Sequence, residues 1–133
     1  IVVSHTEQSL NFYRDKLGMI VFGKSLNEGE TQEALSGVQG AKVKITGLGF
    51  KESNGMGLEF LHYMNPTDGR SAPALNANDL GCTYTVIEVD QFNKVGELQS
   101  AVGAFMPYGT GTIHPAMITK DIDGHRLLFV KKE

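Results

Sequence analysis

The 133-residue sequence contains one cysteine, Cys82. A single cysteine cannot form a disulfide within the chain, which fits a reducing compartment, so we expect a cytoplasmic protein. No stretch approaches the ~18 consecutive apolar residues of a membrane-spanning helix, so we expect no membrane partner. Lysine and arginine form no run and the formal net charge is −3. We therefore also expect no nucleic-acid partner.

The composition is otherwise that of a folded globular domain. Hydrophobic residues make up 41% of the chain and charged residues 20%, both ordinary values for a globular protein. The length is enough for one domain with a sizeable core. Sixteen glycines against four prolines indicate many tight turns between short strands.

The stretch from residue 9 to residue 21 predicts a helix that turns directly into a strand. Leu10, Tyr13 and Leu17 recur on one face of a 3.6-residue period. Gly18 follows the last periodic residue, where a helix commonly ends in a left-handed conformation. The apolar, partly β-branched run at 19–21 then predicts a strand.

The first half of the chain has the order β-α-β-β-β. We expect the tail of a strand at 1–3, a helix with Thr6 as its N-cap, and strands at 19–23, 41–50 and 57–63. A polar section at 24–40 lies between the strands at 19–23 and 41–50. It contains one short helical turn at 31–35, which ends at Gly37. In the strand at 41–50, Val43 and Ile45 alternate with polar residues, which predicts one wet face.

The second half repeats this order after a polar, turn-rich linker at 65–80. We expect a strand at 82–89, a helix carrying Phe92, Val95, Leu98 and Val102 on one face and closed by Gly103, and strands at 104–106, 113–120 and 126–131. The final strands of the two halves, 57–61 and 126–130, can be laid on each other. The sequence therefore predicts a duplicated βαβββ module.

The run at 9–21 and the closing Asp-x-Asp-Gly hairpin at 121–130 resemble the vicinal oxygen chelate superfamily. This group holds glyoxalase I, the bleomycin-resistance proteins, methylmalonyl-CoA epimerase and extradiol dioxygenases. The resemblance implies an α+β fold in which two βαβββ modules in tandem form curled mixed sheets around a cleft. We expect a single domain over 1–133, with modules at 1–64 and 81–133 joined by the linker, and a homodimer.

The resemblance also indicates where a metal would bind in metal-using members, whose ligands come from the first and last strand of each module. Carried over, one ligand position falls upstream of Ile1, and the others fall on Glu59, Tyr84 and Leu128. Glu59 can coordinate, Tyr84 is a poor ligand, and Leu128 has no donor atom. A divalent ion needs several oxygen or nitrogen ligands, so we expect no cofactor and no tightly bound metal.

Side-chain alternation along the strands supplies the other candidate site residues. We expect Glu59 to be the catalytic residue, if there is one, and the ligand to contact Leu61, Tyr63, Tyr84, Val86, His114 and Leu128. The same alternation directs His62 away from Glu59. Asp121 and Asp123 could form a carboxylate pair, but Asp-x-Asp-Gly is first a turn sequence.

Three functions fit these observations. The first is a metal-free protein that binds a small organic ligand against aromatic and aliphatic side chains. The second is a lyase, isomerase or epimerase of the same superfamily, which uses Glu59 as a general base or as a metal ligand. The third is a structural or regulatory module without a ligand. The sequence does not name the ligand, because that choice depends on the side chains of the site.

Overall fold

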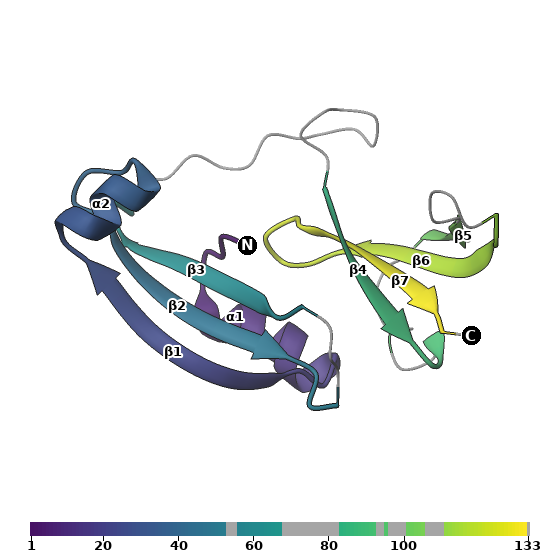
Figure 1. Cartoon of the computed structure of the whole chain (residues 1–133). Helices are drawn as coiled ribbons and strands as arrows, with labels where there is room; N and C mark the ends of the chain where they lie inside the picture. Colours follow the sequence, from purple (N-terminus) through teal and green to yellow (C-terminus); the bar gives the residue numbers. More distant parts are fainter. Residues whose placement is uncertain (53–55, 68–82, 93–94, 96–100, 106–110, 133) are drawn as a thin grey trace. The chain divides into compact units, whose positions relative to one another are not determined.

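The computed structural model describes residues 1–52, 56–67, 83–92, 95, 101–105 and 111–132 (Figure 1). The chain divides into two compact units, Ile1–Ser71 and Ala72–Glu133. Each unit is built on its own β-sheet, so we describe the two sheets separately.

The first unit has an antiparallel sheet in the order β1-β2-β3. Its strands are β1 (Ile20–Glu28), β2 (Lys42–Gly49) and β3 (Leu58–Asn65). The N-terminal segment lies alongside β3 in parallel orientation, with Val2 opposite Leu61. The Val3 amide donates to the Leu61 carbonyl at 3.0 Å, and the Leu61 amide donates to the Ile1 carbonyl at 2.8 Å. Residues 1–3 therefore act as a short fourth strand, as the sequence predicts.

The predicted helix is present in two parts, α1 (Thr6–Leu10) and the wider π-helical η1 (Asn11–Lys16). Its periodic residues Leu10 and Tyr13 are fully buried, and the Tyr13 ring meets Phe60 of β3 edge-on at 5.2 Å. The helix stops where expected, because Gly18 has φ +77°, a value that a residue with a side chain rarely adopts.

Two local predictions in this unit are wrong. Thr6 is not the N-cap: His5 holds that place without a side-chain cap bond, and the Thr6 hydroxyl lies 3.1 Å from His62 Nδ1 instead. The strand predicted to end at Gly23 continues to Glu28 through a polar segment. It does so because β2 supplies backbone partners along its whole length, and Glu28 forms an ion pair with its neighbour Lys42 at 2.9 Å.

The other elements of the first unit agree with the sequence. The short helix α2 (Glu30–Ser36) ends at Gly37, which is left-handed with φ +67°. β3 continues to Asn65, so the first residue of the predicted linker belongs to this strand. Most of that linker, 68–80, and part of the predicted turn at 51–55 lie outside the described residues.

The second unit has four strands in the order β4-β7-β6-β5. These are β4 (Tyr84–Val89), β5 (Ala101–Phe105), β6 (His114–Lys120) and β7 (Arg126–Lys131). β4 runs parallel to β7, whereas β6 is antiparallel to both β7 and β5. The predicted final two strands are confirmed.

The prediction of a helix that extends to Gly103 is wrong at the C-terminal end of that helix. Val102 and Gly103 lie in β5, where they pair with Met117 and Ala116 of β6. The helical spacing of Val102 misled the prediction because a β-branched residue suits a strand equally well once a partner strand is present. Leu98 lies outside the described residues, and the Val95 amide closes one turn onto the Phe92 carbonyl at 3.0 Å.

The two sheets repeat one topology. In each, the first segment of the unit runs parallel to the last strand, and the two remaining strands follow in antiparallel order. Phe60 and Phe129, matched in the sequence repeat, are both fully buried. The registers also agree. Leu61 and Val130 are matched residues of the two final strands, and they lie opposite Val2 and Glu88 respectively. The fold is thus the predicted α+β duplication.

Candidate functional site

The helix divides the first sheet into a covered face and an open face. Phe60 packs on Tyr13, and His62 contacts Thr6, so both side chains lie on the covered face. Alternation along β3 places Glu59, Leu61 and Tyr63 on the opposite side, as the sequence predicts. We call this side, with the partners Gly47 and Ile45 of β2, the open face of sheet 1.

Two glycines leave the backbone bare beside Glu59. Gly47 pairs with Glu59 on one side and with Gly23 of β1 on the other. Among the described residues, a Cβ added at Gly23 would meet no atom within 4 Å, and one added at Gly47 would meet only the Gly23 carbonyl oxygen at 3.9 Å. Glycine in a strand often marks a place where a ligand approaches the backbone closely. This strip was not among the predicted site residues, although Gly47 and Gly49 at alternate positions were a signal for it.

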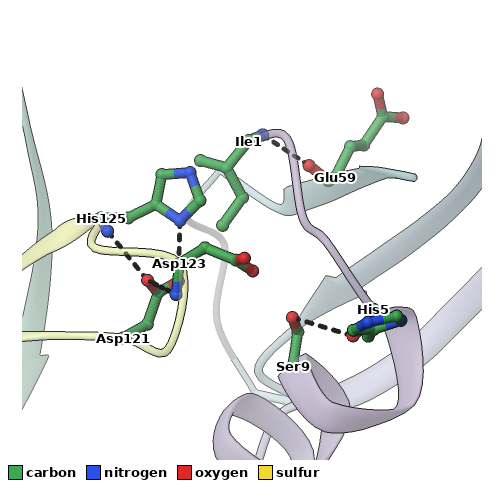
Figure 2. A network of polar contacts seen from close by, with 7 residues as sticks. All are labelled: Ile1, His5, Ser9, Glu59, Asp121, Asp123 and His125. Carbon is green, nitrogen blue, oxygen red and sulfur yellow. Dashed lines mark hydrogen bonds and ion pairs between the residues drawn. The ribbon is translucent and has the colours of Figure 1, made fainter. Parts of the chain in front are cut away.

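The side chain of Glu59 is exposed. Its main-chain oxygen accepts a hydrogen bond from the Ile1 nitrogen at 2.7 Å, while the carboxylate extends away from that contact (Figure 2). The carboxylate therefore stands at the end of the glycine strip, available to a polar group of a ligand.

An aromatic ring borders the same strip. The pairing of β1 with β2 shifts register between Val21 and Gly23, and such bulges turn a side chain to a new direction. Phe22 sits in this shift and is 65% exposed. Its Cε2 atom lies only 2.6 Å from where a Cβ of Gly49 would be, so the ring covers Gly49. No periodic signal in the sequence pointed to Phe22.

The second sheet has an equivalent face, which we call the Tyr84 face. Alternation and register arrange it in three rows across β4, β7 and β6. The rows are Tyr84–Arg126–Lys120, Val86–Leu128–Ile118 and Glu88–Val130–Ala116. His114 continues the β6 set beyond Ala116. All four ligand-contacting residues predicted in this half therefore share one face.

The middle of the Tyr84 face is apolar. Leu128 forms a buried cluster with Ala116 and Val130, whereas Val86 is 52% exposed. The guanidinium carbon of Arg126 stands 5.8 Å from the centre of the Tyr84 ring, within the range of a cation–π interaction. Arg126 was not among the predicted site residues.

Asp121 and Asp123 form a turn rather than a catalytic pair. One Asp121 oxygen accepts the amides of Asp123 and His125 at 3.0 and 2.8 Å, and the other lies 2.8 Å from His125 Nδ1 (Figure 2). The Asp121 side chain has no exposed surface. This carboxylate stabilises the hairpin between β6 and β7.

Two of the positions that the resemblance assigns to metal ligands, Tyr84 and Leu128, lie on the Tyr84 face of sheet 2. Leu128 is apolar and packed among apolar neighbours, so it can only disfavour a charged ion. Tyr84 offers a phenol oxygen, which is a poor ligand, on a ring whose centre lies 5.8 Å from the Arg126 guanidinium carbon. Within the part of the chain that the structure describes, no three histidine, cysteine or acidic residues come together as a metal-binding group.

Comparison with known proteins bears on this arrangement. The family model of the Glyoxalase/Bleomycin resistance protein/Dioxygenase superfamily matches residues 1–129. A glyoxalase family protein from Bacillus cereus has a similar structure, with a TM-score of 0.73 at 19% identity over 98% of this chain and 89% of that one. A glyoxalase family protein from Enterococcus faecalis gives a TM-score of 0.61 at 17% identity, over 97% and 90% of the two chains. No curated protein matches.

A third solved structure has the same fold at lower identity. It is a glyoxalase/bleomycin resistance protein/dioxygenase from Alicyclobacillus acidocaldarius, with a TM-score of 0.58, 10% identity and coverage of 98% and 86%. At these identities the likeness concerns the fold. None of the helices in the described part of this chain is long and apolar enough to cross a membrane.

Proposed function

Because the chain belongs to the glyoxalase/bleomycin resistance protein/dioxygenase superfamily, we propose that it binds a small organic molecule without the metal usual in many members. The open face of sheet 1 and the Tyr84 face of sheet 2 form the binding surfaces. Small-molecule sites are mostly apolar with a few placed polar groups, and both faces have that character.

One observation carries the proposal: each face combines accessible apolar side chains with a few polar groups. On sheet 1, the bare glycine strip adjoins Glu59, and Phe22 covers Gly49 on the same strand as Gly47. On sheet 2, Val86 and Ile118 remain 52% and 39% exposed beside the buried Leu128. Exposed apolar groups on a sheet face cost hydration free energy, which a bound ligand would recover.

Methyl NMR with a library of small aromatic and aliphatic compounds tests the proposal. We expect a binder to shift the methyl signals of Ile45 and Leu61, or of Val86 and Ile118. Two matched probes lie elsewhere and should stay unmoved: Leu35 on α2, 79% exposed, and Ile122 in the hairpin turn, 54% exposed. Compounds that shift only these two methyls, or a library without any binder, would favour a module without a ligand.

The second candidate is a lyase, isomerase or epimerase that uses Glu59 as a general base. The specific support is the space beside this carboxylate, since neither Gly47 nor Gly23 places a side chain next to it. A base must come within about 3 Å of the atom that carries the proton it removes, and a flat carbonyl compound can lie on a bare strip of backbone.

Deuterium uptake next to the carbonyl of small keto acids and thioesters, followed by NMR in heavy water, separates the two candidates. An enzyme would label its substrate, and Glu59→Gln would abolish labelling. Glu7→Gln removes an exposed acid of α1, the helix on the covered face of sheet 1, and should leave labelling intact. Binding without label exchange would support the metal-free binding protein, and equal labelling by Glu59→Gln would exclude Glu59 as the base.

A further inference from the structure

The outer edge of β1 is open to a partner strand. β1 ends its sheet on one side, and within the described part of the chain it pairs only with β2 (Figure 1). Residues 24–28 form the regular part of this strand, because the register shift lies before them, between Val21 and Gly23. All five are exposed except the half-buried Asn27. An edge of this kind presents backbone amides and carbonyls to another strand.

The side chains of this edge differ between its two sides. Lys24, Leu26 and Glu28 lie on the side of the covered face, and Ser25 and Asn27 lie on the open face. Leu26 is 51% exposed, so the helix of this unit does not cover the edge. A strand that joins β1 would therefore meet a leucine between a cation and an acid.

The two charges of the edge are differently engaged. No ion pair of the described residues involves Lys24. Glu28 contacts Lys42 of β2 at 2.9 Å, yet its side chain remains 56% exposed. A carboxylate has two oxygens and can accept from more than one cation, so a second lysine can approach Glu28 from the open edge.

One antiparallel register between two copies of β1 matches these side chains. The faces of the two sheets agree only if the two-fold axis passes through a residue, because opposite residues must point to the same side. An axis at Lys24 would place the two lysines opposite each other, and an axis at Ser25 or Asn27 would place a charged residue opposite Leu26. An axis at Leu26 places the two leucines together and Lys24 opposite Glu28. Opposite charges across an antiparallel pair stabilise it, and like charges destabilise it.

We propose that a second copy of this chain docks on the β1 edge, antiparallel, with Leu26 at the two-fold axis and Lys24 of each copy opposite Glu28 of the other. A lysine on an edge strand commonly prevents pairing, but in this register it meets an acid. The axis is perpendicular to the sheet, so sheet 1 becomes continuous across the two copies and both open faces lie on one side. The inference names the partner of an edge and is independent of the proposed ligand.

Exchange of the two charges tests the register. In a dimer of the Lys24→Glu variant two acids are opposite each other twice, and in a dimer of Glu28→Lys two lysines are. We expect each variant alone to dimerise about tenfold more weakly than the parent in sedimentation equilibrium. An equimolar mixture of the two variants has opposite charges at both positions, so it should dimerise as tightly as the parent.

A control variant separates this contact from the ion pair within the chain. Lys42→Gln removes the cation that already contacts Glu28 and leaves both contacts between the copies in place. It should dimerise at least as tightly as the parent. Circular dichroism shows whether each variant is folded, and the cysteine variants below replace any charge variant that is not.

Cysteine cross-linking tests the axis directly. In a Cys82→Ser background, Leu26→Cys should form a disulfide-linked dimer on oxidation, because opposite residues have Cα atoms about 4.5–5.5 Å apart, which suits a disulfide. Leu35→Cys in the same background is the matched control, since Leu35 on α2 is 79% exposed and lies outside the pairing. It should stay largely uncross-linked.

The outcomes bear on the inference in different ways. A parent chain that sediments at 14.5 kDa at every concentration overturns it, and the edge would then suit a strand of another protein. A mixture of the two charge variants that dimerises no better than either alone overturns the register, as does equal cross-linking of Leu26→Cys and Leu35→Cys. None of these results decides the proposed ligand binding, which the compound library tests separately.

Discussion

At the scale of single residues, Thr46 is a buried polar group with an unusual environment. Its side chain is fully buried on the covered face, opposite Phe60, and its hydroxyl has no hydrogen-bond partner among the described residues. An unpaired buried hydroxyl costs free energy. We expect Thr46→Val to keep or raise the free energy of unfolding by up to about 1 kcal/mol, measured by urea denaturation.

Thr6 provides the control for this change. It is equally buried, but its hydroxyl contacts His62 Nδ1, so Thr6→Val should lower the free energy of unfolding by about 1 kcal/mol. If both variants lose the same amount, Thr46 has a partner such as a bound water.

Asp121 is the residue on which the last hairpin depends. Replacement by alanine leaves the amides of Asp123 and His125 without their acceptor, so we expect Asp121→Ala to cost on the order of 2–3 kcal/mol of stability. Asp121→Asn keeps one acceptor oxygen and should cost less. Thermal unfolding followed by circular dichroism gives the order. Equal stability of the alanine variant and the parent would show that the turn forms without this side chain.

At the scale of an element, Gly18 at the end of the helix and Gly23 in the strand that follows have different backbone conformations. Gly18 has φ +77°, whereas Gly23 is not among the glycines with a positive φ, and a Cβ added at either would meet none of the described residues within 4 Å. Gly18→Ala should destabilise by roughly 1–2 kcal/mol because alanine is strained in the left-handed region. Gly23→Ala should raise the free energy of unfolding by about 0.4–1 kcal/mol because it restricts the unfolded chain.

The same pair of variants reports on the site. Gly23→Ala adds a methyl group to the bare strip beside Glu59 and should weaken any ligand that lies on the open face of sheet 1, while Gly18→Ala should not. A Gly18→Ala variant as stable as the parent would show that the helix end can relax out of the left-handed conformation.

At the scale of the whole molecule, we expect a homodimer. β1 is the outer strand of its sheet among the described residues, and Phe22 and Leu26 on it are 65% and 51% exposed. Exposed apolar edge strands are usually covered by another element or chain. Light scattering across a dilution series should give twice the chain mass of 14.5 kDa at high concentration.

A pair of leucines tests where the dimer forms. Leu26→Lys places a charge on the β1 edge and should shift the equilibrium toward the monomer. Leu35→Lys changes a leucine on α2 that is 79% exposed and should leave it unchanged. A constant mass of one chain at every concentration would contradict the dimer, and equal behaviour of both variants would place the contact elsewhere.

The expectation of no metal also concerns the whole chain, because the resemblance assigns ligand positions in both halves of the sequence. We expect calorimetry with zinc or nickel to show no tight binding, since Leu128 offers no donor. Tight binding that Glu59→Ala abolishes would show that the ligands were assigned to the wrong positions.

The sequence by itself determined the features that depend on a few consecutive residues. Gly18 and Gly37 end helices because local backbone sterics alone decide which residue can adopt the left-handed conformation. Alternation placed Leu61 and Tyr63 with Glu59, and Tyr84 with Val86, because a strand puts successive side chains on opposite faces. The repeat of these local patterns was enough to predict the duplicated module.

The tertiary structure decided what depends on a partner strand. β1 continues to Glu28, and Val102 joins a strand, because neighbouring strands satisfy their backbone groups and override weak local preferences. Phe22 covers Gly49 through a register shift that no local pattern encodes. Lys120, Arg126 and Tyr84 form one row only because three separate strands pair in one register. Register is fixed by long-range pairing.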